Sequence, residues 1–117
     1  MKDHPRHHIY ERDNFTCQYC GWNGTTNFEQ WLRGCLSLDH VVPLKHGGKD
    51  EDANLVVACQ VCNKLKGQEK CSSVEEGKEI IAGKRAESER WFRYFVLKKN
   101  NCIATQPTIP ADQAGLS

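Results

Sequence analysis

Short apolar runs, separated by polar segments that contain glycine, predict small secondary-structure elements in this chain. The run at 36–42 (LSLDHVV) is rich in β-branched residues and predicts a strand. This strand should end before Pro43, because proline has no N–H to donate to a sheet. Gly47 and Gly48 indicate a turn, and residues 54–58 (NLVVA) predict a second short strand. The pattern therefore predicts two strands joined by a glycine-containing loop.

A helical pattern follows the second strand. The segment that starts at Cys59 (CQVCNKLKGQEK) predicts a helix, so the order strand, loop, strand, helix predicts a ββα unit over about residues 36–70. Ser73 and Glu76 have the spacing of a capping box, which marks the start of a longer helix. The fold class is therefore expected to be α+β, with flanking helices within 5–16, around 29–33 and over about 73–99.

The C-terminal part of the chain contains one strongly apolar cluster, WFRYFVL at 91–97. We expect this cluster to pack on the body of the domain, and an interface between two copies of the chain is the alternative. Residues 101–117 contain two prolines and no periodicity, so a disordered tail is expected there. Residues 1–100 should then form a single domain. All three tryptophans are expected in the core: Trp22, Trp31 and Trp91.

The composition indicates a thin hydrophobic core. Only 38% of the residues are hydrophobic and the mean hydropathy is −0.67, so a bound metal would help such a domain to fold. No apolar run is long enough to span a membrane, and the N-terminal segment lacks the apolar stretch of a secretory signal. We therefore expect a cytoplasmic protein in a reducing compartment. There, seven cysteines favour metal binding over disulfide formation.

Four of the cysteines form two pairs with the spacing of zinc knuckles, Cys17 with Cys20 and Cys59 with Cys62. Two knuckles complete a tetrahedral site of four thiolates, which leaves no open position for a substrate. The sequence therefore predicts a structural Zn²⁺ that holds the two ends of the strand-loop-strand unit. The remaining cysteines lack a paired spacing and are interpreted as small apolar residues: Cys35, Cys71 and Cys102.

Asp39 and His40 stand side by side in the first predicted strand, where a charged pair needs partners. Neighbours in a regular strand point to opposite faces, so both can reach one site only if the strand ends or bulges there. A lone histidine in a strand is more often structural than catalytic. However, a ββα hairpin brings the first strand close to the start of the helix. Oxygen atoms of Asp39 and Asn63 could then bind a hard divalent cation.

Three segments resemble the HNH endonuclease family in order, spacing and residue type: RDNFTCQYCG at 12–21, LDHVVPLKHGG at 38–48 and NLVVACQVCNKLKG at 54–67. The resemblance implies a ββα-metal fold, also called the His-Me finger, held by the four-cysteine zinc site. By resemblance, His40 is the general base that activates water. Asp39 and Asn63 are the ligands of the catalytic cation. Asn54 is the residue that holds the hairpin loop and so orients His40.

Position 63 is asparagine where the name of the family leads one to expect histidine, so the chain resembles the His-Asn-Asn variant. An amide oxygen is a hard ligand, which favours Mg²⁺ or Mn²⁺ over Zn²⁺ at the catalytic position. The function implied is metal-dependent hydrolysis of DNA phosphodiester bonds. A neutral imidazole can accept the proton of water near neutral pH, and the cation stabilises the developing charge. One base and one cation per chain predict nicking of one strand at a time.

Basic residues are more frequent in the second half of the chain. Residues 1–63 carry six basic and eight acidic side chains, whereas residues 64–99 carry ten basic and six acidic. This bias is compatible with DNA as a partner, and a solvated surface is the alternative. Lys66 also matches the family pattern. The candidates for phosphate contacts are Lys64, Lys66, Lys70 and His46.

Two other functions compete with the endonuclease. A non-catalytic zinc module that binds nucleic acid or protein would not need the four polar residues at 39, 40, 54 and 63 together. A zinc-thiol redox protein would place a cysteine pair before a thioredoxin-like βαβ pattern, which this sequence lacks. No recognition helix is evident, so a partner protein could direct cleavage by a monomer or a homodimer. The resemblance also implies a bacterial, phage or mobile-element origin.

Overall fold

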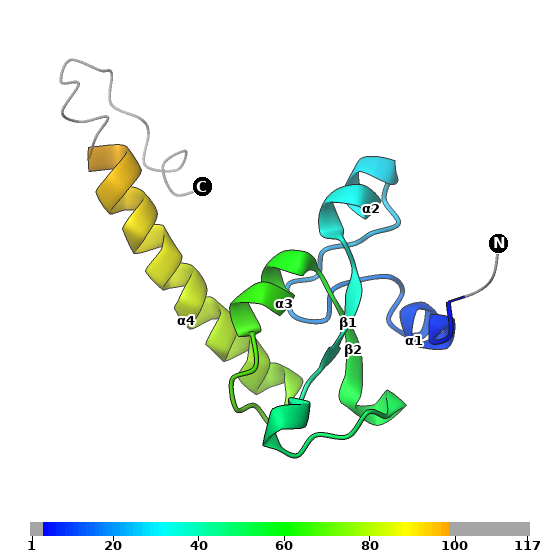
Figure 1. Cartoon of the computed structure of the whole chain (residues 1–117). Coiled ribbons are helices and arrows are strands. Elements are labelled where there is room, and N and C mark those ends of the chain that lie inside the picture. The colour runs from blue at the N-terminus through cyan, green and yellow to red at the C-terminus, as the bar shows by residue number, and fades with distance from the viewer. Residues whose placement is uncertain (1–3, 99–117) are drawn as a thin grey trace. The chain divides into compact units, whose positions relative to one another are not determined.

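The computed structural model describes residues 4–98 of the 117-residue chain. Two strands and four α-helices are found in this part, which confirms the α+β class (Figure 1). Short 3₁₀ turns cover Leu44–His46 and Asp52–Asn54. None of the helices in the described residues is long and apolar enough to cross a membrane. The helices and strands are α1 (His7–Arg12), α2 (Phe28–Gly34), β1 (Ser37–His40), β2 (Leu55–Ala58), α3 (Gln60–Lys66) and α4 (Val74–Phe92), which a π-helical segment (Arg93–Leu97) continues.

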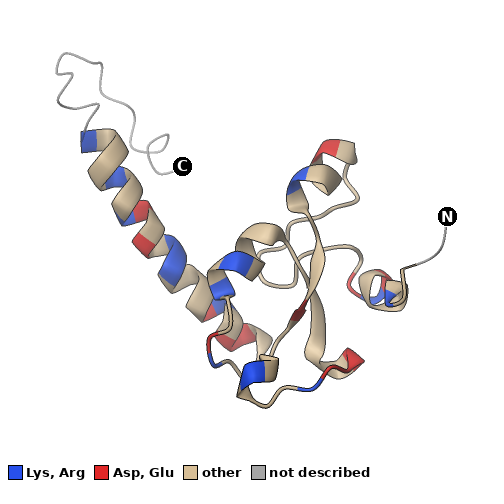
Figure 2. Cartoon of the chain, viewed as in Figure 1, with Lys and Arg blue, Asp and Glu red and all other residues tan. Residues whose placement is uncertain are grey.

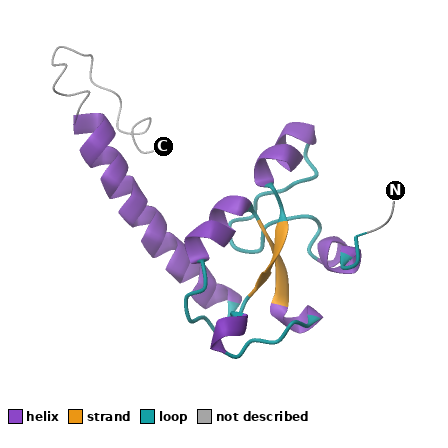
Figure 3. Cartoon of the chain, in the orientation of Figure 1, coloured by secondary structure: helices purple, strands orange, loops and turns teal. Residues whose placement is uncertain are grey.

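The strands β1 and β2 form an antiparallel pair (Figure 3). The register places Ser37 opposite Ala58 and His40 opposite Leu55. Both strands are shorter than the sequence predicted, because β1 ends at His40 and Asn54 belongs to a 3₁₀ turn. One backbone hydrogen bond continues past the strand, from Val41 N to Asn54 O at 2.9 Å. The expected pair of strands is thus confirmed, with ends that leave His40 at the start of a loop.

The helix α3 completes the predicted ββα unit. Cys59 caps its N-terminus, with Sγ accepting from the backbone N–H of Cys62. Gly67 follows its last residue with φ of 57°, a positive value that favours glycine and ends the helix. From the last turn, Lys66 donates to the backbone carbonyl of His40 at 3.1 Å. The helix therefore lies against β1 at the end where the strand stops.

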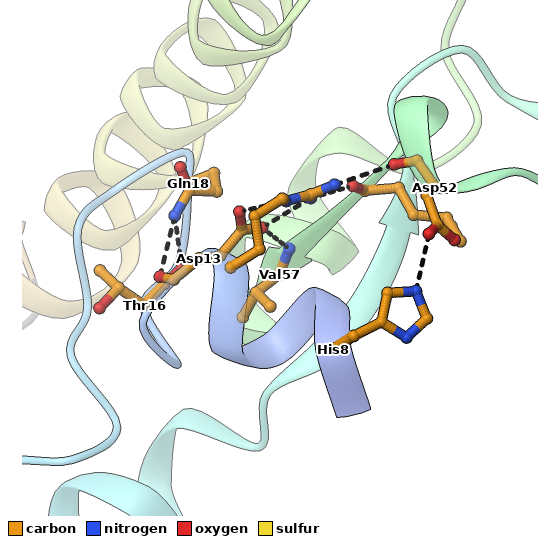
Figure 4. A network of polar contacts seen from close by, with 8 residues as sticks. His8, Asp13, Thr16, Gln18, Asp52 and Val57 are labelled. Atoms are coloured by element: carbon orange, nitrogen blue, oxygen red, sulfur yellow. Dashed lines mark hydrogen bonds and ion pairs between the residues drawn. The ribbon is translucent and has the colours of Figure 1, made fainter. Parts of the chain in front are cut away.

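The helix α1 is bound to the other strand by a polar network (Figure 4). Asp13, directly after α1, accepts from the backbone N–H of Val57 at 2.9 Å. Arg12 donates to the backbone carbonyls of Asp52 and Leu55, and Figure 4 shows His8 against Asp52, 2.7 Å apart. These contacts place the N-terminal segment along β2 and its preceding turn. The predicted helix within 5–16 is confirmed.

The helix α4 starts where the capping pattern predicts. Ser73 Oγ accepts from the backbone N–H of Glu76 at 3.1 Å. The reciprocal bond of a capping box is not made, because the Glu76 carboxylate accepts from Ser72 Oγ instead. The chain forms two compact units, Met1–Ala82 and Gly83–Ser117, and the boundary between them falls within this helix. The prediction of one domain over residues 1–100 stays a prediction.

The core of the first unit is built around the cysteine frame. Its buried members are Cys17, Tyr19, Ala58, Cys59, Cys62 and Ile81. Of the three tryptophans, Trp22 packs against this core as expected, and the prediction is wrong for the exposed Trp31. Trp91 belongs to the second unit, where its side chain is exposed. Cys71 is buried as expected and Cys35 is exposed. Cys102 and the predicted tail lie outside the described residues.

In the second unit, the aromatic residues of the apolar cluster pack against one another. The rings of Trp91 and Phe95 stack with centroids 5.1 Å apart, and Tyr94 meets Phe95 edge-on at 5.0 Å. All three side chains are exposed in the structure. Whether the cluster packs on the body of the domain or on a second copy stays a prediction.

Candidate metal centre and active site

The two cysteine pairs come together as the spacing predicts. The four Sγ atoms all lie within 4.8 Å of one another: those of Cys17, Cys20, Cys59 and Cys62. Cys20 Sγ and Cys59 Sγ are 3.7 Å apart, and tetrahedral Zn²⁺ with bonds of about 2.3 Å holds its sulfurs roughly 3.8 Å apart. In each knuckle the backbone N–H of the second cysteine approaches the first sulfur at 3.5 Å. The geometry therefore fits a structural zinc site.

The chemistry of the four thiols fits a cation as well. Burial, and next the nearby charge of Cys17, raise the pKa of Cys20 to about 11. The same two causes, in the same order, raise the pKa of Cys62 further. Four thiolates this close repel one another, and a Zn²⁺ ion at their centre converts this repulsion into attraction. The cluster is thus a donor set that a divalent metal completes.

Asp39, His40 and Asn63 line one pocket of about 340 Å³. The sequence raised the question of how neighbouring strand residues could share a site. Both residues belong to β1, and His40 is its last residue, so the pocket lies at the end of the strand. Pro43, Leu44 and Lys45 line the same pocket from the following loop. The structure thus brings together the three residues for which the resemblance implies a base and two cation ligands.

Asp39 is the buried member of this group, with 7% of its surface exposed. Its Oδ2 accepts from the hydroxyl of Tyr19 at 2.6 Å and lies 3.1 Å from Lys66 Nζ. Within residues 4–98, both polar contacts of this carboxylate fall on Oδ2, so Oδ1 is the oxygen available to a cation. Burial, and next the bond to Asp39, raise the pKa of Tyr19 far above its ordinary value, which keeps the hydroxyl protonated as a donor.

Asn63 lies at the middle of α3 and turns its amide group toward the start of β1. Its Nδ2 donates to Ser37 Oγ at 3.0 Å. With Nδ2 in this contact, the amide oxygen, the hard donor, is left for another partner. Oxygens of Asp39 and Asn63 fit a hard divalent cation such as Mg²⁺ or Mn²⁺.

His40 is held from the loop that follows β1. Its Nε2 lies 2.9 Å from Asp50 Oδ1, and 27% of its side chain is exposed. Arg6 binds the same carboxylate with both guanidinium ends, at 2.8 and 2.7 Å. These contacts, that of Arg6 first and that of His40 next, hold the pKa of Asp50 well below its ordinary value. A carboxylate only accepts hydrogen bonds, so Nε2 carries a proton and, in the neutral ring, Nδ1 carries the free lone pair.

Asn54 bonds to the loop between the strands through three hydrogen bonds. Its Oδ1 accepts from Val42 N, and its Nδ2 donates to the carbonyls of Val42 and Lys49, each at 2.9 Å. Gly48 completes this arrangement, because a Cβ at that position would collide with the Val42 carbonyl. The loop that begins after His40 is thus fixed by one side chain.

The candidates for phosphate contacts divide into two groups. Lys64, Lys70 and His46 are exposed, as such contacts require. Lys66 is fully buried, and its ammonium group is held by Asp39 and by the His40 carbonyl. This burial contradicts the prediction that Lys66 meets phosphate. Figure 2 shows further basic residues on the loop that follows β1, and Lys45, an exposed residue there, lines the pocket itself.

Three residues of the site were missed by reasoning from the sequence: Tyr19, Asp50 and Arg6. Tyr19 stands inside the first knuckle, so its position next to the metal frame was a usable signal. Asp50 opens an acidic stretch, Asp50-Glu51-Asp52, that reads as an exposed loop. Its contact with His40 depends on how the loop folds back, which residue types alone do not reveal.

The comparison with protein families agrees with this geometry. The family model of the HNH endonuclease matches residues 17–69, from the first cysteine to just beyond α3. This segment is therefore an HNH endonuclease domain, with the small α+β fold and the four-cysteine cluster described above. No curated protein and no solved structure matched the chain.

Proposed function

We propose that this protein is a metal-dependent endonuclease that hydrolyses phosphodiester bonds of DNA. The observation that carries the proposal is the pocket shared by His40, Asp39 and Asn63. It combines an imidazole with an available lone pair and two oxygen donors suited to a hard cation. The HNH family is composed mainly of nucleases, which supports the same reading.

In the proposed reaction, His40 accepts the proton of the attacking water at Nδ1 while Nε2 donates to Asp50. Asp39 and Asn63 would hold Mg²⁺ or Mn²⁺ through oxygen atoms of their side chains. A cation held there supplies stabilisation of the charge that develops on the phosphate and on the leaving oxygen. Asn54 fixes the loop that starts after His40 and so limits the movement of the ring.

DNA binding is proposed to involve exposed basic residues, of which Lys45 lines the pocket: Lys45, Lys64, Lys70 and His46. Lysine contacts to phosphate position a duplex without reading its sequence. This supports low sequence selectivity for the chain by itself, with a partner protein as the source of any specificity. A cluster of four thiols also supports a reducing compartment such as the cytosol as the proposed location.

Incubation of the zinc-loaded protein with supercoiled plasmid tests the proposal. Mg²⁺ or Mn²⁺ should allow conversion of the plasmid, and EDTA should stop it. The Asp39→Asn variant, tested at the same zinc content, distinguishes the catalytic cation from the structural zinc. It alters a proposed ligand of the cation and leaves all four thiolates of the zinc site in place. If plasmid is bound but never cut under any of these metals, the chain is a non-catalytic zinc module instead.

A further inference from the structure

The hydrogen bond between Tyr19 and Asp39 links the zinc frame to the proposed cation site. We propose that Tyr19 is a positioning residue, which holds Asp39 Oδ2 so that Oδ1 faces the catalytic cation. This inference rests on the proposed function, since it assumes that Asp39 is a cation ligand. Tyr19 would thus contribute to binding of the catalytic cation, although it stands between Cys17 and Cys20, two proposed ligands of the structural zinc.

The position of Tyr19 is fixed from the zinc side. It lies between Cys17 and Cys20 in the first knuckle, and only 7% of its surface is exposed. The backbone of the same knuckle is bonded to β2, since Gln18 N donates to Val57 O at 2.9 Å. From this anchored turn the Tyr19 hydroxyl reaches Asp39 Oδ2 at 2.6 Å. The distance indicates a short, strong bond of a hydroxyl to an ionised carboxylate.

The second contact on Asp39 Oδ2 comes from the other knuckle. Lys66 belongs to α3, which Cys59 caps and which also carries Cys62 and Asn63. Its ammonium group, fully buried, lies 3.1 Å from Oδ2. One carboxylate oxygen is therefore held by two donors, one from the segment of each knuckle. Such outer contacts orient a metal ligand and are commonly worth 10- to 100-fold in metal affinity or activity.

The ring of Tyr19 is also held by close contact with α4. A Cβ on Gly77 would lie 2.6 Å from Tyr19 Cε1, closer than side chains approach one another. Glycine is unfavourable inside a helix, and the close approach of the Tyr19 ring explains why a residue without a Cβ stands at position 77. An alanine at this position must displace the ring, and with it the hydroxyl that reaches Asp39. At Gly83, a glycine further along the same helix, an added Cβ meets nothing within 4 Å.

The test measures binding of Mn²⁺ by electron paramagnetic resonance to the zinc-loaded full chain, with zinc content and melting temperature recorded for each variant. Tyr19→Phe keeps the ring and removes the hydroxyl. We expect its Kd for Mn²⁺ to rise about tenfold, with one zinc per chain retained. Tyr10→Phe, which removes a hydroxyl from α1, is the matched control and should bind Mn²⁺ like the unaltered protein.

A second pair of variants moves the ring instead of truncating it. Gly77→Ala should weaken Mn²⁺ binding in the same direction, whereas Gly83→Ala should leave it unchanged. In cleavage assays, the concentration of Mn²⁺ that gives half the maximal rate should rise for Tyr19→Phe. The maximal rate at saturating Mn²⁺ should fall by a smaller factor, because the defect lies in holding the cation.

The Asp39→Asn variant distinguishes failure of the Tyr19 role from failure of the proposed cation site. If Asp39→Asn loses Mn²⁺ binding while Tyr19→Phe binds it like the unaltered protein, the role of Tyr19 is overturned and the proposed function stands. If Asp39→Asn itself binds Mn²⁺ normally, Asp39 is not a ligand, and the proposed cation site and the role of Tyr19 both fail. Loss of zinc from Tyr19→Phe would overturn the positioning role in favour of a purely structural one.

Discussion

His40 Nε2 and Asp50 Oδ1 lie 2.9 Å apart, at the junction of β1 and the loop that follows it. Since Asp50 only accepts hydrogen bonds, this contact selects the tautomer of His40 whose lone pair is on Nδ1. Arg6 holds the carboxylate from the other side. The arrangement supplies an orienting partner for the proposed base, and the sequence did not predict this partner.

Asp50→Asn should slow cleavage by about tenfold or more, because an amide can also donate and so no longer selects one tautomer of His40. Cleavage rates and the ¹⁵N NMR signals of the imidazole would be measured together. Asp52→Asn is the matched control, since Asp52 contacts His8 instead. An unchanged tautomer and rate in Asp50→Asn would remove Asp50 from the mechanism.

Arg6→Ala should raise the pKa of Asp50 toward the ordinary aspartate value of about 3.9. In the unaltered protein this pKa is depressed, so the stabilisation from the ionised carboxylate is present above the ordinary value and is lost as the pH falls through the lower folded value. The ¹³C NMR titration of the Asp50 carboxyl checks this. Arg33→Ala, which removes an exposed arginine paired with Glu29, should leave the titration unchanged.

His40→Ala should abolish cleavage while zinc content, folding and DNA binding stay close to those of the unaltered protein. Proton transfer by a positioned base contributes about 10² to 10⁴ in rate, and this substitution removes no thiolate and no cation ligand. Plasmid cleavage, zinc analysis and a DNA-binding titration on the same preparation measure the three quantities. Residual cleavage within about threefold of the unaltered rate would exclude His40 as the base.

Cys59→Ser should lose zinc and unfold the domain, because binding of a structural zinc contributes directly to the free energy of folding. Cys59 is also the cap of α3 and a member of the core. Melting temperature and bound zinc are the measurements, and Cys35→Ser, an exposed cysteine outside the cluster, is the control. A zinc-free Cys59→Ser protein with the unaltered melting temperature would contradict the prediction.

The protein should nick duplex DNA before it linearises it, because residues 4–98 provide one proposed base and one proposed cation site. A time course on supercoiled plasmid, with light scattering on the same sample, measures product order and oligomeric state. Nicked circles should accumulate first. Linear product that appears without a nicked intermediate, from a protein that scatters as a dimer, would indicate paired sites, with the exposed aromatic cluster at 91–97 as a candidate interface.

The parts of this fold that could be predicted from sequence depend on local patterns. Paired cysteines specify their own geometry, and two β-branched runs specify the strand pair. The burial of Lys66 could not be predicted, because its periodicity places it on a helix but only the buried Asp39 explains its inward direction. Trp31 was misplaced for a related reason. An aromatic residue on a seven-residue helix is buried only if another element covers it, and residue type does not report that.

The position of the two knuckles has a consequence for how the protein matures. They enclose residues 21–58, which include Asp39, His40 and Asn54, and Asn63 follows immediately after Cys62, the last cysteine of the second knuckle. The strand pair and helix α3 bring these groups together, and we expect that arrangement to be stable only once zinc is bound, because a structural zinc contributes directly to the free energy of folding. A newly made chain is therefore expected to be inert toward DNA, and cleavage begins with the first zinc ion it acquires. The supply of zinc would thus determine when the proposed catalytic cation can take part in cleavage.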